Sequence, residues 1–232
     1  MFASNPHPLE AIRGLTDIGS MVDPHAHWEK VYATKRPEQV SWYRPHLEIS
    51  LDLIKSAAPQ LEAQVIDVGA GESTLIGDLV ALGYVNLCAL DISLAALSVA
   101  KARLGASAGR VKWLAADVRT VSLDAHRFDV WHDRAVFHFL TRAGDRAAYV
   151  RQLERAVKPG GHLIVAAFGP QGPSRCSGLE VVRYDPHALH AEFGAAFTLL
   201  EHRSELHRTP AGAIQQFTYC MCRLGSGRNG DG

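Results

Sequence analysis

The stretch VIDVGAGEST at residues 65–74 decides the fold of this chain. Residues 64–68 form the short apolar run of a buried strand, and residues 73–82 carry the apolar spacing of a helix. Gly69 and Gly71 lie between the two, where they permit a tight turn and let a ligand lie against the bare backbone. Ligands of open α/β sheets bind at the carboxyl ends of the strands, so this turn is predicted to belong to a binding site.

Strand and helix signals alternate along the rest of the chain. Four more apolar runs predict strands and three stretches have helical spacing, whereas two late segments alternate as an antiparallel hairpin would. The pattern predicts one α/β domain whose mostly parallel sheet carries helices on both faces and ends in an antiparallel C-terminal hairpin. The strands are expected at residues 85–90, 111–115, 128–131 and 162–168, the helices at 93–104, 145–157 and 184–193, and the hairpin at 197–202 and 214–222. Residues 24–224 form this domain, between a flexible arm at residues 1–23 and a tail at residues 225–232.

Charge and composition narrow the class of protein. Lys and Arg together number 24, as do Asp and Glu, so the formal net charge is zero. A protein that holds a nucleic-acid backbone or an anionic membrane needs a basic excess, so we expect neither partner. Four cysteines are too few for a disulfide scaffold, and no apolar run approaches the about 18 residues of a membrane span. A cytoplasmic protein with reduced thiols is therefore expected.

Metal binding is not expected. The twelve histidines are scattered, and His25 and His27 have no cysteine or carboxylate nearby at the spacing of a zinc site.

Two acidic residues follow successive strands. Asp91 comes at the end of the second predicted strand, where it can accept hydrogen bonds from both hydroxyls of a ribose. Asp117 follows the third strand and is placed to bind an adenine amino group. A dinucleotide-binding turn has a third glycine, which would fall at position 74, but this chain has Thr74 there. Glu72 also places a carboxylate at the start of the helix, where a pyrophosphate needs free backbone amides. We therefore expect a cofactor without phosphates.

These motifs resemble those of the class I S-adenosylmethionine-dependent methyltransferases over roughly residues 24–223. DVGAG at residues 67–71 is similar to their first motif, and KPGG at residues 158–161 to the turn before their fifth strand. The resemblance implies a Rossmann-like, doubly wound sheet of seven strands and S-adenosylmethionine (SAM) as cofactor, with S-adenosylhomocysteine as its product. It also implies these cofactor-binding residues: Asp67, Gly69, Ala70, Gly71, Ser73, Asp91, Ile92, Asp117, Val118 and His132.

A second resemblance concerns the acceptor. DRA at residues 133–135 with GDRAAY at residues 144–149 is similar to the thiopurine S-methyltransferase group, and HWEKVY at 27–32 with SWY at 41–43 resembles an aromatic block of halide, thiol and thiopurine methyltransferases. In that group, Trp28, Tyr32 and Trp42 would close over the amino-acid end of the cofactor. The methyltransferases that modify lysines of elongation factors share a looser version of the block. The aromatics could instead simply pack the N-terminal helix.

The acceptor is expected where the fourth strand ends. The Asn/Asp-Pro-Pro-Tyr motif of enzymes that methylate DNA or glutamine amides is missing there, which argues against those substrates. An amine acceptor needs a base. The candidate catalytic residues are His132, Asp133, Arg134 and His138, with Arg134 either steadying an anionic substrate or pairing with Asp133 or Asp145. The candidate substrate-binding residues are Tyr43, which is also a weaker candidate base, Arg134, Phe137, Arg175 and Cys176.

Several functions remain open at this point. The first is methyl transfer by in-line displacement to a small-molecule acceptor, a thiol or another soft nucleophile, by a monomer or homodimer. The alternative enzyme is a protein lysine N-methyltransferase, for which the partner is a protein substrate. A SAM-binding protein without transferase activity and an NAD-binding oxidoreductase are less favoured.

Overall fold

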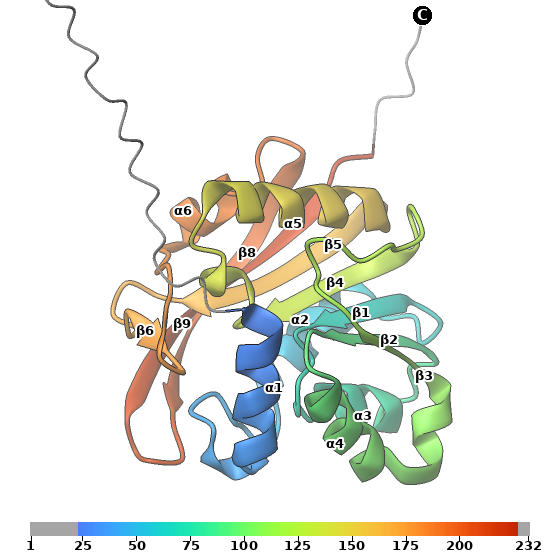
Figure 1. Cartoon of the computed structure of the whole chain (residues 1–232). Helices are drawn as coiled ribbons and strands as arrows, with labels where there is room; N and C mark the ends of the chain where they lie inside the picture. The colour runs from blue at the N-terminus through green and yellow to red at the C-terminus, as the bar shows by residue number, and fades with distance from the viewer. Residues whose placement is uncertain (1–22, 227–232) are drawn as a thin grey trace, which may run out of the picture.

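A computed structural model describes residues 23–226 of the chain, so most of the predicted arm and tail lies outside the described residues. Seven strands form one sheet in the order β3-β2-β1-β4-β5-β9-β8 (Figure 1). The pairs among the first five are parallel, and β9 joins β5 and β8 in antiparallel pairs. The predicted α/β fold with its C-terminal hairpin is confirmed. The strands are β1 (Gln64–Val68), β2 (Asn86–Asp91), β3 (Val111–Ala115), β4 (Phe128–Arg134), β5 (Val157–Phe168), β8 (Phe197–Arg208) and β9 (Ile214–Leu224).

Helices cover both faces of the sheet (Figure 1). Val65 packs in one core with α2 and α3, whereas the next residue, Ile66, packs in another with α5 and α6. Successive side chains of a strand point to opposite faces, so a strand buried on both faces reads as a continuous apolar run. The helices are α1 (Pro24–Thr34), α2 (Glu48–Ala57), α3 (Leu75–Ala81), α4 (Leu94–Leu104), α5 (Ala143–Ala156) and α6 (Pro186–Ala191). Two-residue strands β6 (Arg175–Cys176) and β7 (Leu179–Glu180) form a small separate sheet.

The start of α4 follows from local chemistry. Ser93 precedes the helix in an extended conformation, and its hydroxyl accepts a hydrogen bond from Ala96 N at 3.2 Å. Such a cap satisfies one of the backbone N–H groups that a helix start leaves free. The helix ends before Gly105, whose positive φ of 55° breaks the helical path. Both limits match the sequence prediction.

Several predicted boundaries are wrong, among them the end of the first hairpin strand, predicted at residue 202, which β8 extends to Arg208. β4 continues three residues beyond the predicted end at Trp131, because His132 pairs in register with Asp67 of β1 and Ile164 of β5. Polar residues inside the sheet end the apolar run without ending the strand. Residues 158–161, predicted as a turn, lie inside β5, which begins at Val157 opposite Phe128 with a register shift.

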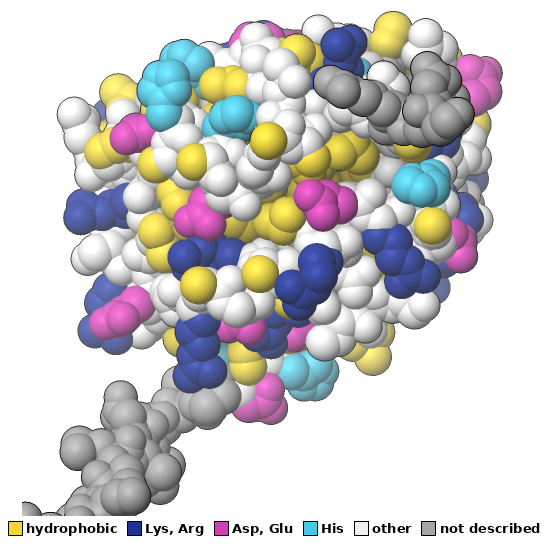
Figure 2. Space-filling view, turned by 90° about the horizontal axis from the view of Figure 1, so that it is seen from above, with side chains coloured by type: hydrophobic (Ala, Val, Ile, Leu, Met, Phe, Trp, Pro, Cys, Tyr) yellow, Lys and Arg dark blue, Asp and Glu magenta, His cyan; other side chains and the backbone are white. Residues whose placement is uncertain are grey.

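The outer surface carries charges of both signs. On the face over α5 and α6, Lys and Arg side chains are interspersed with Asp and Glu (Figure 2). None of the described helices has the length and apolar character to cross a membrane.

Tyr149 of α5 is expected to be a main contributor to stability. Its hydroxyl donates to Asp133 Oδ2 at 2.7 Å and accepts from Trp131 Nε1 at 2.8 Å, and all three residues are buried. Tyr149→Phe leaves Trp131 Nε1 without a partner and removes one of the three donors to the buried Asp133, so it should lower the free energy of unfolding by about 2–4 kcal/mol in urea titrations. The matched variant Tyr84→Phe removes one bond to a backbone carbonyl, Ala58 O at 2.8 Å, and should cost about 1 kcal/mol. Equal losses would contradict this account of Asp133.

Candidate functional site

The turn after β1 accepts only glycine at two positions. Gly69 and Gly71 have φ values of 69° and 49°, in the left-handed region. A Cβ on Gly69 would overlap the Val136 side chain, and a Cβ on Gly71 would lie 2.7 Å from the Tyr32 hydroxyl. The bare backbone therefore fits between the loop after β4 and helix α1.

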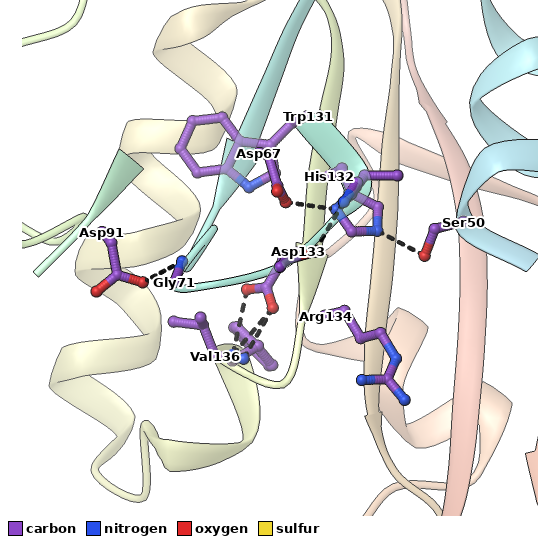
Figure 3. A network of polar contacts seen from close by, with 12 residues as sticks. Ser50, Asp67, Gly71, Asp91, Trp131, His132, Asp133, Arg134 and Val136 are labelled. Carbon is purple, nitrogen blue, oxygen red and sulfur yellow. Dashed lines mark hydrogen bonds and ion pairs between the residues drawn. The ribbon is translucent and has the colours of Figure 1, made fainter. Parts of the chain in front are cut away.

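Asp91 holds this turn from the end of β2. Its Oδ2 accepts from Gly71 N and its Oδ1 from Ser93 N, both at 2.8 Å (Figure 3). Burial raises the pKa of Asp91 to about 6, although the two hydrogen bonds lower it. Each carboxylate oxygen can accept a second hydrogen bond, so Asp91 can hold the turn and still bind a ligand.

Asp67 leaves one oxygen free. Its Oδ1 lies 2.7 Å from His132 Nδ1, and His132 Nε2 lies 2.9 Å from Ser50 Oγ (Figure 3). Both nitrogens of the imidazole are therefore engaged. Asp67 Oδ2 is buried and has no hydrogen-bond partner among the described residues. A buried carboxylate oxygen without a partner is costly, so this position suits a ligand that brings a donor.

Asp117 is held by a neighbouring guanidinium. Arg119 Nε lies 3.0 Å from both Asp117 oxygens, and Arg119 NH1 bonds Asp145 Oδ1 at 2.7 Å. The hydrogen bonds from Arg119 keep the pKa of Asp117 below its ordinary value although burial opposes them. Asp117 is thus an ionised acceptor of fixed orientation.

Helix α1 brings aromatic rings to the same edge of the sheet. Glu29 accepts from Leu94 N at 2.5 Å, which ties α1 to the start of α4. The Trp28 ring then lies 5.0 Å from Phe139 and 5.8 Å from Trp42, centroid to centroid. The predicted aromatic residues both pack against one another and face a cavity.

Two neighbouring cavities lie at this edge. The large cavity has a volume of about 800 Å³ and the small cavity about 50 Å³. Tyr32, Trp42, Gly69 and Arg134 line both, so they mark the junction. Every predicted cofactor-binding residue lines one or both: Trp28, Asp91, Ile92, Asp117 and Val118 the large cavity, Asp67, Ala70, Gly71, Ser73 and His132 the small one, and Tyr32, Trp42 and Gly69 both.

The candidate bases His132, Asp133 and His138 are buried and engaged in hydrogen bonds. Asp133 accepts from Val136 N at 2.9 Å, from Phe137 N and from the Tyr149 hydroxyl, so it shapes the turn after β4. His138 accepts from Phe168 N at 3.2 Å, and burial together with Arg134 lowers its pKa to about 3. Neither Asp133 nor His138 lines either cavity.

Arg134 does not pair with Asp133 or Asp145. Its guanidinium reaches the C-terminal hairpin, where it bonds the Tyr219 hydroxyl at 2.9 Å and Glu205 Oε2 at 3.4 Å. It also lies 4.2 Å over the Phe217 ring and donates to Trp42 O at 3.1 Å. A buried cation is thereby fixed at the junction of the two cavities.

Two of the remaining candidate substrate-binding residues line a cavity and two do not. Cys176 lines the large cavity and Tyr43 the small one. Phe137 instead packs in the core against Tyr149, and Arg175 is exposed and bonds Gly178 O at 2.7 Å. The cavity wall near them is formed by Phe139, Phe168, Leu179 and Glu180, which the sequence prediction missed.

Part of the chain resembles known proteins in sequence. Residues 65–161 match a family model described as "Methyltransferase domain". A Mus musculus protein described as eEF1A lysine and N-terminal methyltransferase is 24% identical over 138 residues, which make up 60% of this chain and 19% of that protein. The chain thus spans about a fifth of the curated relative that it matches.

Solved structures with this fold include methyltransferases. One comes from work on the conversion of a disulfide bond into a thioacetal group during echinomycin biosynthesis. Its TM-score is 0.68 at 19% identity, and the match covers 88% of this chain and 94% of that chain. The N-methyltransferase NodS from Bradyrhizobium japonicum WM9, in complex with S-adenosylhomocysteine, has a TM-score of 0.66 at 14% identity and covers 86% and 97%. At these identities the solved structures show a shared fold alone, and neither they nor the domain match confirms the thiopurine-like subgroup.

The raised pKa of Asp91 predicts a pH dependence of stability. Between its ordinary value of 3.8 and about 6, the folded protein keeps a proton that the unfolded chain loses. Stability of the wild type relative to Asp91→Asn should therefore fall by about 2–3 kcal/mol as pH rises from 4 to 7, measured by urea unfolding. Asp117→Asn is the control of opposite sign, because the lowered pKa of Asp117 makes its contribution disappear as pH falls. The same slope for both variants would contradict this description of the site.

Proposed function

We propose that this protein transfers the methyl group of SAM to a small apolar or aromatic molecule whose nucleophile is a thiol or another soft, acidic group. The observation that carries the proposal is the junction of the two cavities, where Arg134 is fixed while His132, Asp133 and His138 are buried and engaged. The cofactor and the acceptor class are considered in turn.

The residues present fit an adenosyl cofactor with an amino-acid end. Asp91 has acceptor capacity for ribose hydroxyls, and Asp117 is an oriented acceptor for an adenine amino group. Asp67 Oδ2 is a buried acceptor that lacks a donor in the small cavity. The larger cavity would hold the adenosine and the acceptor, and the smaller one the amino-acid end.

The chemistry asks the protein mainly for alignment. Bound SAM would supply a methyl group activated by its sulfonium, so that in-line attack on the methyl carbon breaks the methyl–sulfur bond and releases S-adenosylhomocysteine. Positioning and exclusion of water can account for about 7–11 kcal/mol of such a barrier. Trp28, Trp42 and Phe139 form an aromatic wall that excludes water from the junction.

The junction favours an acceptor that reacts as an anion. Both His132 nitrogens are engaged, Asp133 has three donors, and His138 is kept neutral by burial. Burial raises the pKa of Cys176 to about 11 and that of Tyr32 well above its ordinary value, so both are protonated near neutral pH. Arg134 would stabilise a thiolate beside it and oppose an approaching ammonium.

Protein lysine N-methylation is the second candidate. The observation in its favour is the match to the mouse protein described as a methyltransferase of eEF1A lysine and N-terminus. An amine must arrive deprotonated. Glu180, an exposed residue of β7 on the wall of the large cavity, is the carboxylate that could take its proton.

A transfer assay distinguishes the two acceptor classes. The full chain is incubated with methyl-labelled SAM and, separately, with aryl and alkyl thiols, a selenide, amines and a cell lysate. We expect label on thiols, most strongly on aryl thiols that fit the aromatic wall. Label that appears mainly in one lysate protein would overturn the small-molecule proposal.

The pH profile of the same assay tests for a protein base. With a thiol that ionises without help, the inflection in kcat/KM should move with the pKa of the thiol used. Glu180→Gln should leave that profile in place. An inflection that stays fixed across thiols and disappears in Glu180→Gln would contradict the thiolate account.

A further inference from the structure

Two buried carboxyl groups in the small cavity lack partners. Asp67 and Glu72 are 3% and 6% exposed, and both line this cavity. Asp67 Oδ2 and Glu72 Oε2 each find no hydrogen-bond donor among the described residues. Buried polar atoms are almost always paired, so two orphaned oxygens in one 50 Å³ space call for a donor from outside the chain.

Two arginine side chains also line the small cavity. They are Arg44 and Arg134, and Glu205 bonds both, Arg44 NH1 to Glu205 Oε1 at 2.6 Å. The two guanidinium groups share this single carboxylate, although Arg44 also bonds the exposed Glu48 at 2.9 Å. Carboxyl and guanidinium groups that line one cavity match the charges of an α-amino acid end group.

From this layout we infer that Glu72 is a second ligand, beside Asp67, for the ammonium group of the amino-acid end. The inference rests on the proposed function and extends it to a residue that the glycine motif does not itself require. An ammonium has three donors, enough to satisfy both orphaned oxygens at once. Arg44 and Arg134 face the carboxylate of the same end group.

A proton is displaced when that ammonium binds. Glu72 faces Arg103 of α4, Glu38 of the turn after α1, and Tyr32 of α1. Burial raises the pKa of Glu72 to about 7, although Arg103 lowers it. An ammonium beside it favours the ionised form, so ligand binding near pH 7 releases about half a proton from this group. At pH 8.5 the group is already ionised and the release disappears.

Calorimetry with a matched pair of ligands tests the inference. S-Adenosylhomocysteine and its desamino analogue, which lacks only the ammonium, are titrated into the wild type and Glu72→Gln. The substitution should lower the affinity for S-adenosylhomocysteine about tenfold and the affinity for the analogue less than twofold. Titrations at pH 7 in buffers of different ionisation enthalpy should show the proton release in the wild type and its loss in Glu72→Gln. Glu38→Gln, an exposed neighbour outside the cavity wall, is the control and should leave S-adenosylhomocysteine affinity within twofold.

The outcomes separate the inference about Glu72 from the proposed function. If Glu72→Gln lowers the affinity for both ligands equally, Glu72 has only a structural role and the inference is overturned. Unchanged affinity together with unchanged proton release would overturn it as well. No binding of S-adenosylhomocysteine by the wild type would instead refute the proposed function, and the role of Glu72 with it.

Discussion

The path of the backbone at Gly69–Gly71 is the constraint on which the site depends. Val136 and Tyr32 close on this turn so tightly that neither glycine can carry a side chain, and Asp91 fixes its amide at 2.8 Å. The loop after β4, the helix α1 and the end of β2 are all positioned by contact with one short turn. A ligand seated there meets bare backbone on one side, aromatic rings on the other and carboxylates at both ends. Gly69 lines both cavities, together with Tyr32, Trp42 and Arg134.

The C-terminal hairpin completes the site from the far end of the sequence. Glu205 and Tyr219 hold Arg134 at the junction, and His207 Nε2 lies 2.7 Å from Ser41 O. The segment that carries Trp42 is thus tied to β8 as well as to Arg134. The charge of Arg134 is costly to bury, and the hairpin offsets that cost with a carboxylate, a hydroxyl and the face of Phe217. In the function proposed above, this fixed cation beside the large cavity favours an anionic nucleophile.

The glycine turn and the positions of Asp91 and Asp117 were predictable from the sequence because each depends on a few neighbouring residues. The role of Asp133 was not, since the backbone N–H groups and the Tyr149 hydroxyl that engage it appear only when the chain folds. Arg134 pairs with Glu205, which lies 71 positions away in the sequence. The predicted pairing of Arg134 with Asp133 or Asp145 was therefore wrong. Phe137 and Phe139 differ by two positions, yet one faces the core and the other the cavity, which a short apolar stretch does not distinguish.

The central claim is that the glycine turn and its acids are built for an adenosyl cofactor with an amino-acid end and no phosphates. The most direct measurement is calorimetric titration of the full chain with S-adenosylhomocysteine and, in parallel, with NAD. The account predicts one-to-one binding of S-adenosylhomocysteine and no heat with NAD. Tight binding of NAD without a response to S-adenosylhomocysteine would contradict it.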